Sequence, residues 1–263
     1  MTAMSHPTIE APPPLPPSEP RPWGFWMTTA FTVAIYGIYI VIQTGIGVIM
    51  AVLWSVRQGG ADPSAYAEDL MNNGLFVAVA TLVAGPLCIL VTLALAHFRK
   101  GITLRDYLAL RRPPILQSIG WTVLTVVVLF GMDSVRIAVG EPLVPEIVVA
   151  WYETAVLLPV LVLAIVVTAP VMEELVTRGF MYRGLAASRV GIPGAIVLTS
   201  LFWAALHFGQ YNLLNTGMIF LFGLILGGAR ATSGSIYLPL FLHALNNGIS
   251  TFQIAYFIGQ AGQ

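Results

Sequence analysis

The chain alternates between long uncharged apolar stretches and short polar segments. Seven apolar stretches follow residue 22, with these bounds: 23–56, 75–98, 115–132, 154–172, 192–206, 213–229 and 236–258. A helix needs about 20 predominantly apolar residues to cross a bilayer, and roughly 17 to 25 are tolerated. Most of the stretches satisfy this length. The pattern therefore predicts an all-α, polytopic membrane helix bundle of about seven transmembrane helices.

Two of the stretches depart from the expected length. The stretch 23–56 is longer than one crossing requires, which predicts a tilted or partly interfacial helix. The polar pair Gln43 and Thr44 leaves open a division of this stretch into two helices. The stretch 192–206 is short. The predicted number of spans is therefore seven, with a margin of one.

The first 22 residues differ from everything that follows. They contain eight of the eighteen prolines and no apolar core. Proline lacks the N–H that a helix interior needs, so this segment predicts a disordered Pro-rich tail. We divide the chain into this tail, N-terminal membrane helices over 23–114, and a second membrane domain over 115–258.

The composition excludes several classes of protein. Hydrophobic residues make up 57% of the chain and charged residues 9%, whereas a soluble domain is about a quarter charged. A soluble enzyme is therefore excluded. Twelve basic and twelve acidic residues balance, and no basic cluster could follow a phosphate backbone, so nucleic-acid binding is set aside. Cys88 is the single cysteine, which excludes an intramolecular disulfide and a Cys-based metal site.

The charges between the apolar stretches predict an orientation. One set of connecting segments is basic and carries Arg99, Lys100, Arg105, Arg111, Arg112, Arg178, Arg183, Arg189 and Arg230. The alternate segments are acidic and carry Asp62, Glu68, Asp69, Glu141, Glu146 and Glu153. Lys and Arg accumulate on the cytoplasmic side of short loops. We therefore expect the N-terminus in the cytoplasm and the C-terminus outside.

Three segments carry polar groups that are costly inside a bilayer. Such groups face the protein interior and are candidates for function. They are Glu173 and Glu174 with Arg178, then His207, and then His243 with Asn246 and Asn247. Elsewhere, Asp133 and Arg136 have the spacing of a pair at the membrane edge, with an arginine that extends to the interface.

The spacing of the candidates shows how they could meet. Glu174 and Arg178 are four residues apart and share a helical face, whereas Glu173 is turned by about 100°. His243 and Asn247 are also four apart. If the helix of 154–172 continues past its apolar run, Glu173 lies about 15 to 24 Å from the cytoplasmic end of the helix, and the two histidines lie about 10 to 20 Å deep. We expect these groups to converge within the membrane.

The three segments also carry a pattern of known motifs. Glu173-Glu174 with Arg178 reads EExxxR, Trp203 with His207 stands where FxxxH is usual, and His243 with Asn247 reads HxxxN. In this order they resemble the CPBP family of intramembrane proteases, which includes type II CAAX prenyl endopeptidases and bacteriocin-immunity proteins. The resemblance covers roughly 115–258. The tryptophan in place of phenylalanine concerns the local shape of the pocket more than the chemistry.

The resemblance implies a hydrolase of the CAAX protease type that carries out proteolysis in a membrane. We expect Glu173 to act as general base, His207 to position the attacking water, and His243 and Asn247 to stabilise the oxyanion. Glu174, Arg178 and Trp203 would support them. The implied substrate is a peptide or a membrane-protein terminus, and the chain resembles bacterial members, which reside in the inner (plasma) membrane.

The sequence leaves open whether a metal is used and whether the protein is an enzyme. Many members of the family are described as metalloproteases, and Glu173, His207 and His243 could in principle hold zinc. Their distribution over three helices without a compact HExxH does not demand a metal, so a metal-free mechanism is favoured. The alternative functions are a non-catalytic, immunity-like or partner-binding membrane protein and a secondary transporter. Against the transporter, the sequence shows no matching halves.

Overall fold

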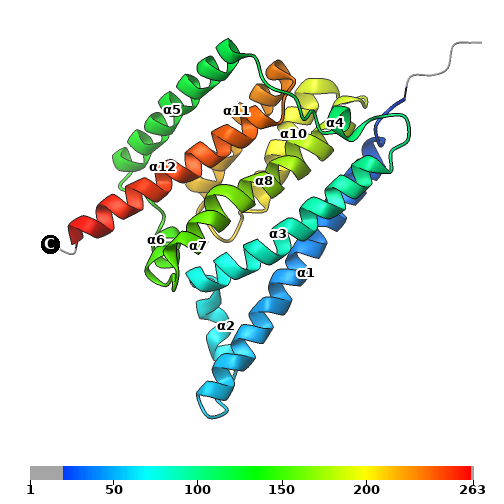
Figure 1. Ribbon diagram of the computed structural model, residues 1–263. Coiled ribbons are helices and arrows are strands. Elements are labelled where there is room, and N and C mark those ends of the chain that lie inside the picture. The colour runs from blue at the N-terminus through cyan, green and yellow to red at the C-terminus, as the bar shows by residue number, and fades with distance from the viewer. Residues whose placement is uncertain (1–19, 262–263) are drawn as a thin grey trace, which may run out of the picture.

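The computed structural model describes residues 20–261 and contains helices and no strand within that range (Figure 1). The predicted all-α class is therefore confirmed for the described part of the chain. The predicted tail, residues 1–22, lies outside the described residues except for 20–22. The division between 23–114 and 115–258 stays a prediction.

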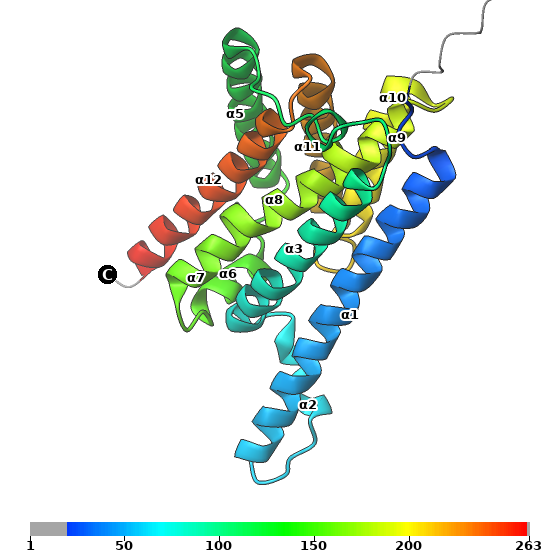
Figure 2. The same cartoon turned by 45° about the vertical axis from the view of Figure 1, so that its right-hand side comes forward.

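The long helices run roughly along a common direction, with shorter ones at the ends of the bundle (Figures 1 and 2). The α-helices are α1 (Phe25–Arg57), α2 (Ser64–Leu70), α3 (Gly74–His97), α4 (Leu104–Tyr107), α5 (Ile115–Ala138), α6 (Glu146–Glu153), α7 (Leu158–Val162), α8 (Ala169–Glu174), α9 (Tyr182–Ala186), α10 (Gly191–Ala205), α11 (Leu213–Ser233) and α12 (Tyr237–Ala261). Two π-helical segments are η1 (Leu163–Thr168) and η2 (Leu175–Met181).

Five helical segments among the described residues are long and apolar enough to cross a membrane. They are Phe25–Arg57, Gly74–His97, Ile115–Ala138, Leu158–Ala186 and Leu213–Ser233. The shorter apolar helix α10 has 15 residues, and α12 has 25. The polytopic membrane bundle is thus confirmed, whereas the number of seven spans stays a prediction. α1 runs unbroken through Gln43 and Thr44, so these polar residues do not divide it.

The helix that carries the two glutamates continues well beyond its apolar run. α7, η1, α8, η2 and α9 form one rod of 29 residues. In η1 the hydrogen bonds shift by one residue, so that the Ala169 N–H donates to the Ala164 carbonyl. The next donor in this register would be Pro170, which has no N–H. The Ile165 carbonyl therefore lacks a partner from its own helix.

The two ends of the bundle differ in charge, and we call them the arginine-rich end and the acidic end. The N-terminal end of α1, the segment 98–114, the loop 187–190 and the C-terminal end of α11 lie along the upper edge in Figure 1. This arginine-rich end carries Arg21, Arg99, Lys100, Arg105, Arg111, Arg112, Arg183 and Arg189, together with Asp106. The acidic end contains α2 and α6 (Figure 1), and it carries Asp62, Asp69, Glu141, Glu146 and Glu153, together with Arg57.

The segment 98–114 closes the arginine-rich end by packing onto the start of α12. The Ile236 N–H donates to the Ala109 carbonyl at 3.0 Å, and the Ser235 hydroxyl donates to the Arg111 carbonyl. A cluster of buried apolar side chains lies beneath this contact: Ala96, Tyr107, Leu108, Leu175, Phe180 and Ile236. Burial of these groups fixes the position of the rod relative to α3 and α12.

Candidate active site

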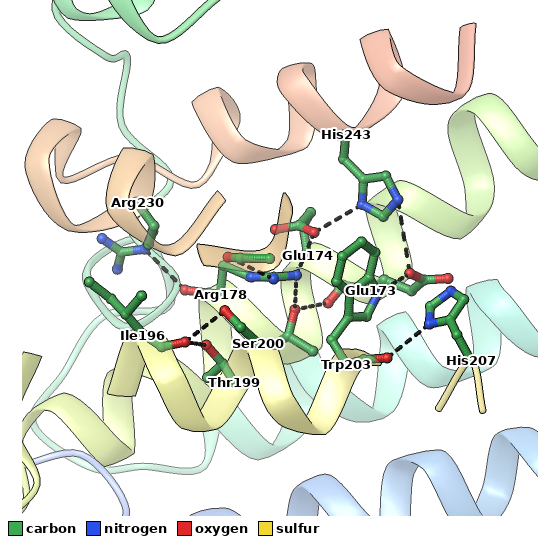
Figure 3. Close-up of polar contacts among 12 residues, drawn as sticks. Glu173, Glu174, Arg178, Ile196, Thr199, Ser200, Trp203, His207, Arg230 and His243 are labelled. Atoms are coloured by element: carbon green, nitrogen blue, oxygen red, sulfur yellow. Dashed lines mark hydrogen bonds and ion pairs between the residues drawn. The ribbon is translucent and has the colours of Figure 1, made fainter. Parts of the chain in front are cut away.

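Three helices, α8, α10 and α12, bring the predicted residues together. α8 carries Glu173 and Glu174, α10 carries Trp203, and His207 follows α10. α12 contributes His243 (Figure 3). Glycine at position 223 of α11 allows the approach of α10, because a Cβ there would lie 2.9 Å from the Ser200 Cβ. The convergence expected from the sequence is therefore present, and it depends on the continuation of the glutamate helix beyond Met172.

Glu174 forms a buried ion pair through one of its two carboxylate oxygens. Its Oε1 lies 2.9 Å from Arg178 Nη1, and both side chains are 0% exposed. The same oxygen accepts a hydrogen bond from His243 Nδ1 at 2.9 Å. Arg178 Nη2 also donates to the Gly223 carbonyl at 3.2 Å. A buried guanidinium without a counterion would be costly, so Glu174 and Arg178 stabilise each other.

Glu173 has different surroundings from its neighbour. Its Oε2 accepts a hydrogen bond from Trp203 Nε1 at 2.5 Å and lies 4.0 Å from His243 Nε2. The side chain is 17% exposed and lines a cavity, whereas neither Glu174 nor Arg178 does so. One glutamate is thus neutralised in the core and the other faces open space. This is the division that the spacing of the EExxxR segment indicates.

His207 is oriented by the backbone of its own segment. Its Nδ1 lies 2.8 Å from the Trp203 carbonyl oxygen. A carbonyl can only accept, so Nδ1 carries the hydrogen and Nε2 of the neutral ring is an acceptor. The His207 ring and the Glu173 carboxylate lie on the same side of the Trp203 indole (Figure 3). His207 therefore presents an acceptor beside the carboxylate.

The Trp203 indole packs against His207, His243 and Arg178. Its ring centroid lies 5.1 Å from those of both His207 and His243. The Arg178 guanidinium carbon lies 4.8 Å from the same ring, within the range of a cation–π contact. The indole thus holds the buried ion pair on one face and directs its N–H to Glu173.

Asn247 is held by the helix opposite it. Its Nδ2 donates to the Ile165 carbonyl at 2.7 Å, which is the carbonyl left without a helical partner before Pro170. Its Oδ1 accepts from Asn246 Nδ2 at 2.9 Å. One Nδ2 hydrogen of Asn247 remains for another acceptor. The residue therefore joins α12 to η1, a role that sequence reasoning missed because the π-helical shift is not visible in the motif.

The site opens into a large cavity of about 810 Å³. Glu173, His207, His243 and Asn247 all contribute to its wall. Ligand pockets typically have volumes of about 300 to 1,000 Å³, and a water molecule takes about 30 Å³. The cavity therefore has room for a short peptide segment together with a water molecule beside Glu173.

A second polar group in the cavity wall lies away from the glutamates. Arg136 Nη1 lies 2.9 Å from Asp133 Oδ1, as the sequence indicates. However, Arg136 Nε donates to Asn215 Oδ1 and Gln253 Nε2 donates to Asp133 Oδ2, each at 2.9 Å. The pair is therefore held by partners on α11 and α12, and the extension of Arg136 to the membrane interface stays a prediction.

The candidate metal ligands do not form a metal site. Zinc in a catalytic site takes three protein ligands at about 2.0 to 2.3 Å. No group of three His, Cys, Asp or Glu residues in the described part of the chain is placed to hold a metal ion. Glu173 Oε2 and His243 Nε2 are 4.0 Å apart, and His243 Nδ1 is bonded to Glu174. Glu173 and His243 are therefore not arranged as ligands of one zinc ion in this structure.

We expect a Trp203→Phe variant to fold with slightly lower stability. Phenylalanine preserves an aromatic ring but removes the N–H that bonds to Glu173. The loss of a hydrogen bond to a charged group costs about 1.5 to 3 kcal/mol, and water in the cavity would offset part of it. Thermal unfolding in detergent measures this difference, with Trp26→Phe as the control because Trp26 is 80% exposed. Equal unfolding temperatures for both variants would contradict the contribution of the indole N–H.

Part of the sequence is similar to a known protein family. Residues 155–249 match the profile of a family described as type II CAAX prenyl endopeptidase Rce1-like. An uncharacterized 24.3 kDa protein of Escherichia coli is 39% identical over 84 residues, which are 31% of this chain and 38% of that protein. The match thus spans about two fifths of the relative. No solved structure matches the chain. The profile covers Glu173, His207 and His243.

Proposed function

We propose, on the premise that the chain belongs to the CPBP family through residues 155–249, that it is an intramembrane endopeptidase in which Glu173 activates a water molecule. The observation that supports this proposal most directly is the difference between the two glutamates. Glu174 is buried and shares its Oε1 between Arg178 and His243, while Glu173 faces a cavity of about 810 Å³ beside His207. A carboxylate that faces a cavity next to an oriented imidazole is suited to general-base catalysis.

The first step forms the bond between water and the peptide carbonyl. A water between Glu173 and His207 transfers one proton to the Glu173 carboxylate as its oxygen attacks the carbonyl carbon. The remaining hydrogen of the water is directed to the acceptor Nε2 of His207. The electron pair of the carbonyl double bond moves to its oxygen, which becomes an oxyanion. The indole N–H of Trp203 holds the Glu173 carboxylate in place during this transfer.

The second step breaks the peptide bond. Glu173 returns its proton to the amide nitrogen as the carbon–nitrogen bond breaks, which releases an amine and a carboxylic acid. A protonated His243 Nε2 and the second Nδ2 hydrogen of Asn247 are the donors that we assign to the oxyanion. Removal of one such donor costs about 3 to 4 kcal/mol in well-studied enzymes. Glu174 holds His243 in the orientation that this donation needs.

The substrate of this protein is a peptide or a membrane-protein terminus, and the protein acts in the bacterial inner membrane. A comparison of membrane proteomes tests the proposal and identifies the substrate in the same experiment. Cells producing Glu173→Gln should accumulate intact peptides or termini that cells producing the wild type or Glu153→Gln cleave. Glu153 is an exposed glutamate outside the cavity wall and provides the matched control. Identical proteomes for all three would favour a non-catalytic partner-binding role.

A further inference from the structure

The cavity wall comes almost entirely from one half of the bundle. Besides the candidate catalytic residues, it includes the middle and C-terminal part of α1, α2, the N-terminal end of α3, the C-terminal end of α5, α6, the loop 206–212, the N-terminal end of α11 and the middle of α12. All of these segments lie toward the acidic end. None of the residues in the segments 98–114 and 187–190 at the arginine-rich end contributes to the wall. The cavity therefore lies in the half of the bundle toward the acidic end.

The arginine-rich side of the site is closed by packed residues. Arg230 Nε donates to the Arg178 carbonyl at 3.0 Å, and Arg178 pairs with Glu174 directly behind Glu173. Beyond them, Tyr107 stacks on Phe180 with ring centroids 5.5 Å apart, and both side chains are fully buried. A peptide approaching from this end would meet an apolar layer and then a charged layer. Access from this end is closed in this structure.

The short helix α10 leaves space on the opposite side. Its 15 residues extend about 22 Å, whereas the hydrocarbon core of a bilayer is about 30 Å thick. α10 begins at the arginine-rich end, so its C-terminus ends inside the membrane. Gln210 and Tyr211 of the following loop line the cavity. Irregular backbone at this depth is tolerated where it borders a water-filled cavity.

From these observations we propose that the cavity opens at the acidic end and that this end faces away from the cytoplasm. The basic residues that accumulate on cytoplasmic loops are concentrated at the other end. A substrate therefore reaches Glu173 from the extracytoplasmic side, past α2, α6 and the loop 206–212. The statement about substrate rests on the proposed protease function, whereas the statement about the opening does not.

The wall of the cavity indicates the class of segment that enters. Uncharged polar side chains such as Gln43, Gln210 and Ser250 alternate with apolar ones. Asp133 and Arg136 also line it, but they neutralise each other. Amide and hydroxyl groups on an apolar wall suit the backbone of an extended peptide with few charges. The substrate is thus an extracytoplasmic peptide or the extracytoplasmic segment of a membrane protein.

Cysteine labelling tests the opening directly, since Cys88 is the single cysteine and is buried. In a Cys88→Ala background, we introduce Ser250→Cys or Gln210→Cys in the cavity and Lys100→Cys at the arginine-rich end. A membrane-impermeant maleimide added to intact bacterial cells, with the outer membrane permeabilised where one is present, should label the two cavity variants and leave Lys100→Cys unlabelled. In inverted vesicles, Lys100→Cys should be labelled strongly and the cavity variants should not.

The control for cysteine reactivity is a position on the lipid-facing surface. Val127→Cys, at a position 61% exposed on α5 and outside the cavity wall, should react poorly from both sides because lipid surrounds it. Cavity variants labelled only from the side that labels Lys100→Cys, or from neither side, would overturn the proposed opening, and so would labelling of Lys100→Cys from outside. The same pattern in a Glu173→Gln background separates the results, because failure of the protease proposal leaves the labelling unchanged.

Discussion

Glu173→Gln is expected to reduce the rate of peptide cleavage by a factor of about 100 to 10,000, which is the usual contribution of a general base. Glutamine retains the size of the side chain and can still accept the hydrogen bond from Trp203 Nε1. It cannot take a proton from water at neutral pH. The substitution therefore removes the chemistry while it preserves the packing. The measurement is kcat/KM of the purified protein in detergent or liposomes, on a peptide found by the proteomic comparison.

Two further measurements make this result specific. Glu153→Gln changes the same functional group at an exposed position and should cleave at the wild-type rate. The unfolding temperature of Glu173→Gln should stay close to that of the wild type, because Glu173 is not part of the buried ion pair. Residual cleavage within tenfold of the wild type would remove Glu173 from the role of base. Cleavage abolished by a metal chelator would require a ligand set that this structure does not bring together among its described residues.

Much of the fold could be predicted from the hydrophobic pattern alone. Apolar stretches of bilayer length have few alternatives to a membrane helix, because backbone groups in lipid must be satisfied internally. The end of the glutamate helix was harder to predict. Its apolar run stops at Met172, yet the helix continues to Ala186 because Arg178 finds Glu174 and the Gly223 carbonyl inside the bundle. A polar residue marks a helix end only when it has no partner in the fold.

The site was predictable where it depended on spacing along one helix. A separation of four residues placed Arg178 next to Glu174 and left Glu173 on another face. The link from Asn247 to Ile165 could not be predicted in the same way. It depends on a one-residue shift of the helical hydrogen bonds just before Pro170, and that shift reflects packing between helices. The same holds for Arg136, whose partners lie on two other helices.

The buried ion pair is the feature whose disruption should cost the most stability. Arg178→Met removes the cation but leaves the Glu174 carboxylate fully buried, with His243 as its remaining hydrogen-bond donor. Breaking a buried pair by removal of one partner typically costs about 3 to 5 kcal/mol. Arg178→Met and Glu174→Gln should each lower the unfolding temperature well below that of Glu173→Gln. Thermal unfolding of the purified variants in one detergent provides the comparison.

The double variant Glu174→Gln/Arg178→Met distinguishes the pair from its two members. It leaves neither charge uncompensated, so it should recover most of the stability that each single change removes. Its rate of cleavage should nevertheless stay below that of the wild type, because a glutamine at 174 holds His243 less firmly than the carboxylate does. A double variant whose loss equals the sum of the two single losses would show that the residues contribute independently.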